Sequence, residues 1–317
     1  MSELKVACYA AGIIGSSFAV NFAMKGIECH VYVTNEDRKT RGTAAIERVI
    51  GSLEKLGVVD EEKNRAIWDK IHVTTDPTEA FSGVSLIQEN GPEKLEVKRE
   101  IMQIIDQYAP ADAVFASSTS GMSITEIAAL SAHPERCIGA HPFNPPHLIP
   151  LVEITKGEQT QQPYVDKALG IYRAAGKEPV VLNKEKKGFI ANRFSHAVLR
   201  EAMALVAEGV CSPEDADRAL VYGPGIRWAV LGQYMVGELG SPGGVKAGML
   251  RFQPMSESIF QDLENLQHMP PEIPDLAEAG VARYKAELPD SIGHTNEEIA
   301  AFRDRVLVEL LRLHGKI

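Results

Sequence analysis

The sequence predicts an α/β protein, with a doubly wound, mostly parallel sheet followed by an all-α C-terminal domain. Three observations predict this fold class. Short apolar runs alternate with helical stretches over the first half of the chain, which is typical of a parallel sheet covered by helices. A glycine motif follows the first apolar run. After about residue 183 the apolar runs stop and only helical patterns remain. We therefore expect two domains, residues 1–184 and residues 185–317.

The expected elements follow from these patterns. Strands are expected where apolar residues dominate short runs, at residues 4–10, 29–33, 71–75, 84–89, 113–119, 137–141 and 151–155. Helices are expected between the strands, at residues 13–25, 36–56, 60–68 and 93–108. In the second half we expect one long helix at residues 188–210 and an amphipathic helix at residues 296–313. Ser212 is expected to cap a further helix, because a proline and an acidic residue follow it at favoured positions.

Composition excludes several classes of protein. At about 150 residues per domain, a chain of 317 residues fits two domains. The net charge of -10 argues against a nucleic-acid partner. A membrane span needs about 18 consecutive apolar residues, and the sequence has no such run. The cysteines are scattered without the spacing of metal ligands, at Cys8, Cys29, Cys137 and Cys211. We expect no metal site, and buried thiols in a reducing cytoplasm.

The glycine motif AAGIIG lies between the first expected strand and the first expected helix. In that context a G-x-G-x-x-G pattern indicates a Rossmann-like domain, in which the dinucleotide pyrophosphate lies on the helix N-terminus. Ala10 replaces the first glycine, and a single methyl group can fit a tight turn. The motif predicts a cofactor site formed by Ala10, Gly12, Ile13, Ile14 and Gly15.

The end of the second expected strand lacks a feature of NAD sites. An acidic residue about 20 residues past the motif usually binds the adenosine ribose hydroxyls. Val33 stands there instead, followed by Thr34 and Asn35, and Glu36 and Asp37 come slightly late. A nearby arginine, Arg38, could meet a 2′-phosphate. We expect NAD, with Thr34 at the cofactor, and leave NADP open.

The stretch HPFNPPHLIPLVE, residues 141–153, indicates catalysis. Its prolines suit neither a helix interior nor a central strand, so His141 and Asn144 are expected on a fixed loop at the carboxyl end of a strand. A neutral histidine there can take a proton from a hydroxyl, and the carboxylate of Glu153 can support its charged form. Ser120 follows another strand in the same way. Taken singly, these residues have ordinary explanations as a surface histidine, a helix cap and a turn; together they favour an active site.

Four stretches resemble, in order and spacing, the 3-hydroxyacyl-CoA dehydrogenase family over nearly the whole chain: QENGPEKLEVK, SSTSGMSIT, GAHPFNPPHLIPLVEI and KGFIANR. The resemblance implies an NAD(P)-binding Rossmann-like domain at residues 1–184, and a helical substrate and dimerisation domain at residues 185–317. It implies that His141 is the general base and Glu153 its partner. It also implies contacts to substrate or nicotinamide from Ser120, Asn144 and Asn192, and a cofactor-side pair of Glu93 and Lys98.

Two stretches narrow the resemblance. HPFNPPHLIPLVE and GPGIRWAVLG look most like the L-carnitine dehydrogenase and L-gulonate 3-dehydrogenase (lambda-crystallin) branch, which acts on small free 3-hydroxy acids. Arg227 could clamp a substrate carboxylate, and a structural ion pair is an equal alternative. A quaternary ammonium group calls for aromatic faces, which could equally be core residues: Phe143, Tyr222, Trp228 and Tyr234. The GQYMVGELGSPGG stretch departs from the carnitine dehydrogenase pattern, which leaves carnitine itself open.

We therefore expect a homodimeric oxidoreductase that reversibly oxidises the 3-hydroxyl of a small free 3-hydroxy acid, carnitine- or gulonate-like, with a nicotinamide cofactor. The nearest alternative substrate is a 3-hydroxyacyl-CoA such as 3-hydroxybutyryl-CoA. A non-catalytic, crystallin-like cofactor-binding protein is a third and weaker alternative. Ala10 and Val33 support it, and the intact set of His141, Glu153, Ser120, Asn144 and Asn192 argues against it. A 3-hydroxyisobutyrate-type dehydrogenase uses a catalytic lysine, so the His141–Glu153 pair disfavours it.

Overall fold

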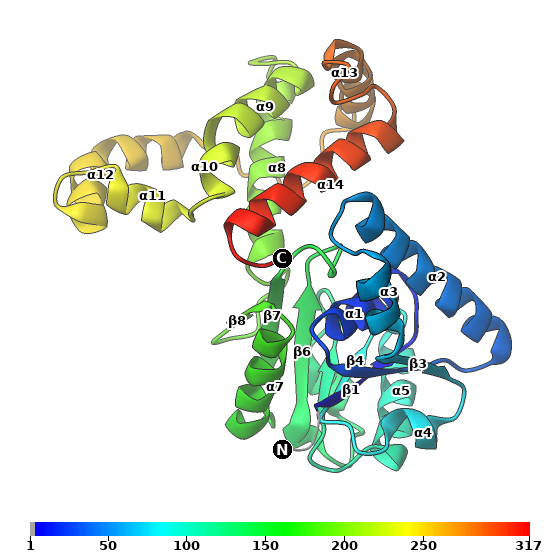
Figure 1. The fold of residues 1–317 in the computed structure, drawn as a ribbon. Helices are drawn as coiled ribbons and strands as arrows, with labels where there is room; N and C mark the ends of the chain where they lie inside the picture. Colours follow the sequence, from blue (N-terminus) through cyan, green and yellow to red (C-terminus); the bar gives the residue numbers. More distant parts are fainter. Residues whose placement is uncertain (1–3) are drawn as a thin grey trace. The chain divides into compact units, whose positions relative to one another are not determined.

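Residues 4–317 are described by a computed structural model of the chain (Figure 1). They divide into two units, and unit 1 comprises the chain through Ala191 together with Leu307–Ile317. Unit 2 comprises Asn192–Val306. The contacts thus divide the chain after Ala191, and the chain returns to unit 1 at its C-terminal end. The expected domain boundary after residue 184 stays a prediction.

Unit 1 contains an eight-stranded sheet in the order β3-β2-β1-β4-β5-β6-β7-β8. Its strands are β1 (Lys5–Tyr9), β2 (Glu28–Tyr32), β3 (Ile71–Thr74), β4 (Leu86–Glu89), β5 (Val114–Ser117), β6 (Cys137–Pro142), β7 (Leu151–Lys156) and β8 (Glu178–Val181). All neighbours are parallel except β6 and β7. The expected mostly parallel sheet is confirmed. The short β8 was not expected, because its four residues include a glutamate and a proline.

Helices cover both faces of the sheet. The unit 1 helices before Ala191 are α1 (Ile13–Met24), α2 (Glu36–Lys55), α3 (Glu61–Trp68), α4 (Pro77–Phe81), α5 (Leu95–Tyr108), α6 (Ile124–Ala128), η1 (Pro134–Arg136) and α7 (Gln162–Ala174). One buried cluster joins β1 to α1, α2, α3 and α7, and a second joins β1 to α4, α5 and α6. Alternate residues of β1 enter alternate clusters, since strand side chains point to opposite faces. The result is a three-layer arrangement (Figure 1).

Unit 2 is helical. Its elements are α8 (Ala191–Ala207), α9 (Pro213–Leu220), η2 (Val221–Gly225), α10 (Ile226–Trp228), α11 (Gln233–Leu239), α12 (Gly244–Asp262), α13 (Ile273–Glu287) and α14 (Asn296–Leu313), of which α8 and α14 extend across the division between the units. The Ser212 cap is confirmed, because its hydroxyl accepts from the Asp215 amide at 3.2 Å. The helix expected at residues 188–210 is shorter, since Gly188 and Phe189 have φ of +77° and +49°. A right-handed helix cannot include such residues.

Candidate active site

The glycine motif forms a tight turn between β1 and α1. Ala10 occupies the left-handed region, with φ of +70°. A Cβ added to Gly15 would lie 2.0 Å from the Ala10 carbonyl oxygen, so only glycine lets helix and turn approach this closely. A Cβ on Gly12 would meet nothing within 4 Å. The backbone at Gly12 therefore faces open space where a ligand can approach.

The start of α1 suits an anion. Gly12 is the N-cap residue and supplies no side chain to the free amides, and the first turn of α1 contains no acidic residue. The unpaired amides and the helix dipole at such an end attract a phosphate. These features of the residues from Gly12 to Gly15 fit the pyrophosphate of a dinucleotide.

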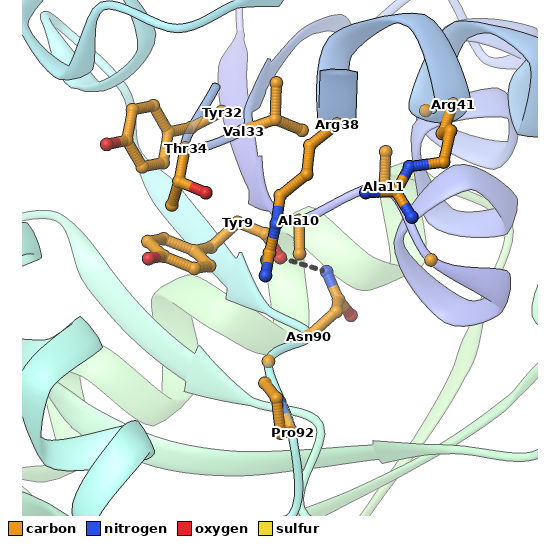
Figure 2. A pocket seen from close by; sticks show the side chains of 13 residues that line it. Tyr9, Ala10, Ala11, Tyr32, Val33, Thr34, Arg38, Arg41, Asn90 and Pro92 are labelled. Carbon is orange, nitrogen blue, oxygen red and sulfur yellow. Dashed lines mark hydrogen bonds between the residues drawn. The ribbon is translucent and has the colours of Figure 1, made fainter. Parts of the chain in front are cut away.

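A cavity of about 390 Å³ opens beside this turn (Figure 2). It lies at the carboxyl ends of β1, β2 and β4, where the strand order reverses and where doubly wound sheets bind ligands. Its lining is Tyr9, Ala10, Ala11, Gly12, Tyr32, Val33, Thr34, Arg38, Arg41, Gly42, Asn90, Gly91 and Pro92. Ala10, Gly12 and Thr34 were expected at the cofactor and line it. Ile13 lines a neighbouring hollow of about 420 Å³.

His141 and Glu153 face each other across two antiparallel strands. They are direct partners in the register of β6 and β7, and His141 Nδ1 lies 2.9 Å from Glu153 Oε2. The expectation that His141 lies on a loop is wrong, because β6 continues through Pro142. The pairing with β7 extends the strand into the proline-containing stretch. A regular sheet, rather than a loop, thus positions this pair.

Both oxygens of the Glu153 carboxylate accept hydrogen bonds. Its Oε1 accepts hydrogen bonds from the backbone amides of Ile190 and Ala191, at 2.8 and 2.9 Å. Ala191 is the first residue of α8, so the carboxylate caps that helix. Burial, at 1% exposure, would raise the pKa of Glu153, but the hydrogen bonds from His141, Ala191 and Ile190 outweigh it and lower that pKa. Glu153 is therefore an anion beside the imidazole.

The pairing fixes which nitrogen of His141 carries the proton. A carboxylate only accepts hydrogen bonds, so Nδ1 donates and a neutral ring presents the lone pair of Nε2. Nε2 has no hydrogen bond to the residues at 4–317 and is not among their buried unpaired atoms. The ring also packs against Phe189, with centroids 5.2 Å apart. A substrate hydroxyl could thus reach a fixed proton acceptor.

Glu93 and Lys98 form part of a larger network at the ends of β4 and β5. Lys98 Nζ lies 3.0 Å from Glu89 Oε2 and 3.4 Å from Glu93 Oε2. Glu93 Oε1 accepts from the amide of Ser120 at 2.8 Å. Sequence reasoning paired Lys98 with Glu93 and missed Glu89, which is fully buried and also accepts from Ser117. Glu89 could have been found in the sequence, because it ends the apolar run of residues 84–89.

The segment between β6 and β7 is anchored at two points. The Ser17 hydroxyl on α1 lies 2.7 Å from His147 Nδ1 and accepts from the His147 amide at 2.8 Å. Lys177 donates to the carbonyls of Pro146 and Ile149. Burial and the Lys25 ammonium group lower the pKa of Lys177 to about 7. Sequence reasoning found neither anchor.

The remaining expected residues are less buried. Asn144 is exposed on the segment between β6 and β7, and Ser120 is exposed after β5. Asn192 lies half-buried in the first turn of α8. Arg227 is exposed in α10, and its side chain has no ion pair with the described part of the chain.

The aromatic residues considered for an ammonium group differ in exposure. Tyr222, Trp228 and Tyr234 are exposed, so their alternative explanation as core residues is wrong. Phe143 is half-buried. Three aromatic rings of unit 2 are thus available to a ligand or to another protein surface.

A histidine cluster lies at the other edge of the sheet. Glu28, His30 and His72 offer donor atoms within 4.8 Å of one another, at the amino-terminal halves of β2 and β3. The Lys5 ammonium lies 3.5 Å from the same Glu28 oxygen that contacts His30. The Glu28 carboxylate thus already has an ion pair with Lys5 and a hydrogen bond with His30. The expected absence of a metal site stays a prediction.

No helix in residues 4–317 combines the length and the apolar character that a membrane crossing needs.

Fold and site together define a class of protein. A glycine turn, an open helix N-terminus and a cavity at the switch point of the sheet fit a dinucleotide. A carboxylate-supported histidine at the carboxyl end of β6 fits proton transfer. This combination is that of a nicotinamide-dependent dehydrogenase.

Comparisons with known proteins place the chain in a family. The model of the 3-hydroxyacyl-CoA dehydrogenase NAD binding domain matches residues 5–186, and the model of the C-terminal domain of the same family matches residues 188–267. The chain belongs to the 3-hydroxyacyl-CoA dehydrogenase family, and it is an oxidoreductase with an NAD-binding domain.

Individual relatives cover nearly the full length. The chain is 35% identical to the L-carnitine dehydrogenase of Streptomyces coelicolor, over 99% of this chain and 95% of the relative. It is 34% identical to the 3-hydroxyacyl-CoA dehydrogenase of Gibberella moniliformis, over 98% and 95%. The solved structure of an NAD+-dependent 5-formyl-3-hydroxy-2-methylpyridine 4-carboxylic acid 5-dehydrogenase is similar, with a TM-score of 0.78 and 28% identity over 98% of this chain and 97% of that one.

Proposed function

We propose that the protein reversibly oxidises the 3-hydroxyl of a small free 3-hydroxy acid, carnitine- or gulonate-like, to the 3-keto acid. The observation that carries this proposal is the His141–Glu153 pair, whose Nε2 has no hydrogen bond to the described residues. The relatives named L-carnitine dehydrogenase support the 3-hydroxy acid as the substrate class.

His141 is the general base in this proposal. Nε2 takes the proton of the substrate hydroxyl, while Nδ1–H stays hydrogen bonded to Glu153. The buried carboxylate then stabilises the imidazolium that forms. A bound nicotinamide cofactor would supply the acceptor for the hydride that leaves the same substrate carbon. In the reverse direction the imidazolium returns its proton to the keto oxygen.

Other residues orient the reactants. In this proposal Ser120 and Asn192 would contact the reacting groups, and Asn144 would contact substrate or nicotinamide. Glu93 and Lys98 line the cofactor side, where the ion pairs of Lys98 fix the position of Glu93. The pyrophosphate would be bound by Ala10, Gly12, Ile13, Ile14 and Gly15, and Thr34 would meet the adenosine ribose.

Charged and aromatic residues of unit 2 suit a zwitterionic acid. The guanidinium group of Arg227 has no ion pair to residues 4–317 and can bind a carboxylate at two points. The exposed rings of Tyr222, Trp228 and Tyr234 offer faces to a quaternary ammonium group.

A CoA thioester is the alternative substrate. The hollow beside α1 is lined by Arg41, Arg48 and Ser52, and its volume of about 420 Å³ could hold a phosphorylated group. The Gibberella moniliformis relative supports this alternative.

We further propose a homodimer in the cytoplasm. Free cysteines support a reducing compartment, and large exposed apolar side chains on α11 and α12 support self-association.

A substrate screen tests the function. L-carnitine, L-gulonate, 3-hydroxybutyrate and 3-hydroxybutyryl-CoA are assayed with NAD and NADP by nicotinamide absorbance. A free acid should give a kcat/KM at least about tenfold above that of the thioester. A higher value for the thioester would establish the alternative, and no turnover of any of them would favour a non-catalytic role.

A further inference from the structure

The ribose end of the cofactor cavity contains no carboxylate. Val33, at the position of the usual ribose-binding acid, is buried and apolar, and none of the lining residues is acidic. The two nearest candidates have other partners. Glu36 accepts from the Thr75 hydroxyl at 3.1 Å, and Asp37 pairs with Arg41. A carboxylate at this end selects against a phosphorylated ribose by charge repulsion, and here that selection is missing.

Arg38 supplies positive charge at the same place. Figure 2 shows its side chain descending from α2 towards Tyr9 and Asn90. Its guanidinium has no hydrogen bond or ion pair to the described residues, and its backbone amide donates to the Asn35 side chain at 2.8 Å. The first turn of a helix disfavours a cation, because the helix dipole is positive there. Arg38 is thus placed where the helix dipole disfavours its charge and where the charge could bind an anion in the cavity.

We propose that Arg38 and the Thr34 hydroxyl bind the 2′-phosphate of NADP, so that the protein uses NADP as well as NAD and binds NADP more tightly. This inference rests on the proposed dehydrogenase function. The guanidinium donates to two phosphate oxygens, and Thr34 donates one further hydrogen bond. Arg41 also lines the cavity and adds charge, although Asp37 partly neutralises it.

Calorimetric titration of the full-length protein tests the site without turnover. Adenosine 2′,5′-bisphosphate should bind at least about tenfold more tightly than ADP, because charge-assisted hydrogen bonds to a phosphate contribute that much. Arg38→Ala should remove this preference. Lys39→Ala is the matched control, since it removes the neighbouring positive charge from a residue that does not line the cavity.

The outcomes separate this inference from the proposed function. Equal binding of the two nucleotides, or tighter binding of ADP, would overturn the 2′-phosphate site and leave the dehydrogenase intact. Binding of neither would overturn both. A preference that survives in Arg38→Ala would overturn the assignment to Arg38.

A second variant tests the cavity from the opposite direction. Val33→Asp introduces the missing carboxylate and should lower the affinity for NADPH by at least about tenfold, measured by nicotinamide fluorescence. NADH should bind as tightly as before or more tightly. Circular dichroism verifies the fold of the variant. Unchanged NADPH affinity in a folded variant would contradict the proposed position of the ribose.

Discussion

Ala10 replaces the first glycine of the G-x-G-x-x-G motif, and its backbone conformation in the structure is strained. Its φ of +70° lies in the region that glycine adopts freely and that a Cβ disfavours by about 1–2 kcal/mol. The turn is kept because Gly15 packs directly against the Ala10 carbonyl. The turn therefore contains conformational strain.

Ala10→Gly should raise the free energy of unfolding by about 0.5–1 kcal/mol, since relief of strain exceeds the added entropy of the unfolded chain. Urea unfolding measures the change. Ala11→Gly is the control, because Ala11 has no positive φ and the substitution should destabilise. A less stable Ala10→Gly variant would contradict the account of the turn.

The contact between His141 and Glu153 was predictable from the sequence, and the buried charged residues that were missed share one feature. His141 and Glu153 were found because proton transfer needs an unusual pair of residue types near the end of a strand. Glu89 and Lys177 were missed, because their partners come from distant segments. A buried charge is recognisable only once the fold supplies its counter-charge or its carbonyls.

At the scale of elements, two structures meet at Glu153. The antiparallel register of β6 and β7 places it opposite His141, and the first amides of α8 bind its other oxygen. The start of α8 therefore helps to hold the His141–Glu153 pair in place. Gly188 and Phe189 turn the chain into this position with positive φ values. The expected helix at residues 188–210 included both residues, because the pattern of apolar residues does not reveal a positive φ.

Glu153→Gln tests this junction through pH. The folded-state pKa of Glu153 lies below its usual value, so the anion stabilises the fold above about pH 4.5, and that contribution is lost as pH falls through the folded-state pKa. The wild type should be more stable than the variant by about 2 kcal/mol at pH 7. The difference should shrink at acid pH. Denaturant unfolding across pH measures it.

Glu158→Gln serves as the control, since it changes an exposed carboxylate on the segment after β7. Its effect on stability at pH 7 should be small, because the side chain is exposed. A stability difference for Glu153→Gln that stays constant from pH 7 down to pH 3 would show that the Glu153 anion contributes nothing to the junction.

At the scale of the whole molecule, the fold class was predictable from the sequence, and the return of the chain to unit 1 was not. Alternating strands and helices are local patterns, so they are visible in sequence. The return of α14 to unit 1 is not, because it depends on the packing of Val308 and Leu311 into the core of the sheet domain. Strands with long apolar runs could be recognised in the sequence. The short strand β8 was missed, because its four residues include a glutamate and a proline.

Exposed apolar residues of unit 2 lead to a prediction about assembly. Met249, Leu250, Met255 and Phe260 of α12 are each more than half exposed. We expect a homodimer that buries such residues, measured by size-exclusion chromatography with light scattering. Phe260→Glu should shift the protein towards monomer. Leu130→Glu, an equally drastic change at an exposed site of unit 1, should leave the dimer unchanged. A wild-type monomer would contradict the assembly.

The central claim is that His141, held by Glu153, takes the substrate proton. Turnover of the preferred hydroxy acid by His141→Ala, measured beside its affinity for NADH and NADPH, tests it most directly. The account predicts that kcat falls at least about a hundredfold while dinucleotide affinity is retained. Turnover at the wild-type rate in the variant would contradict it.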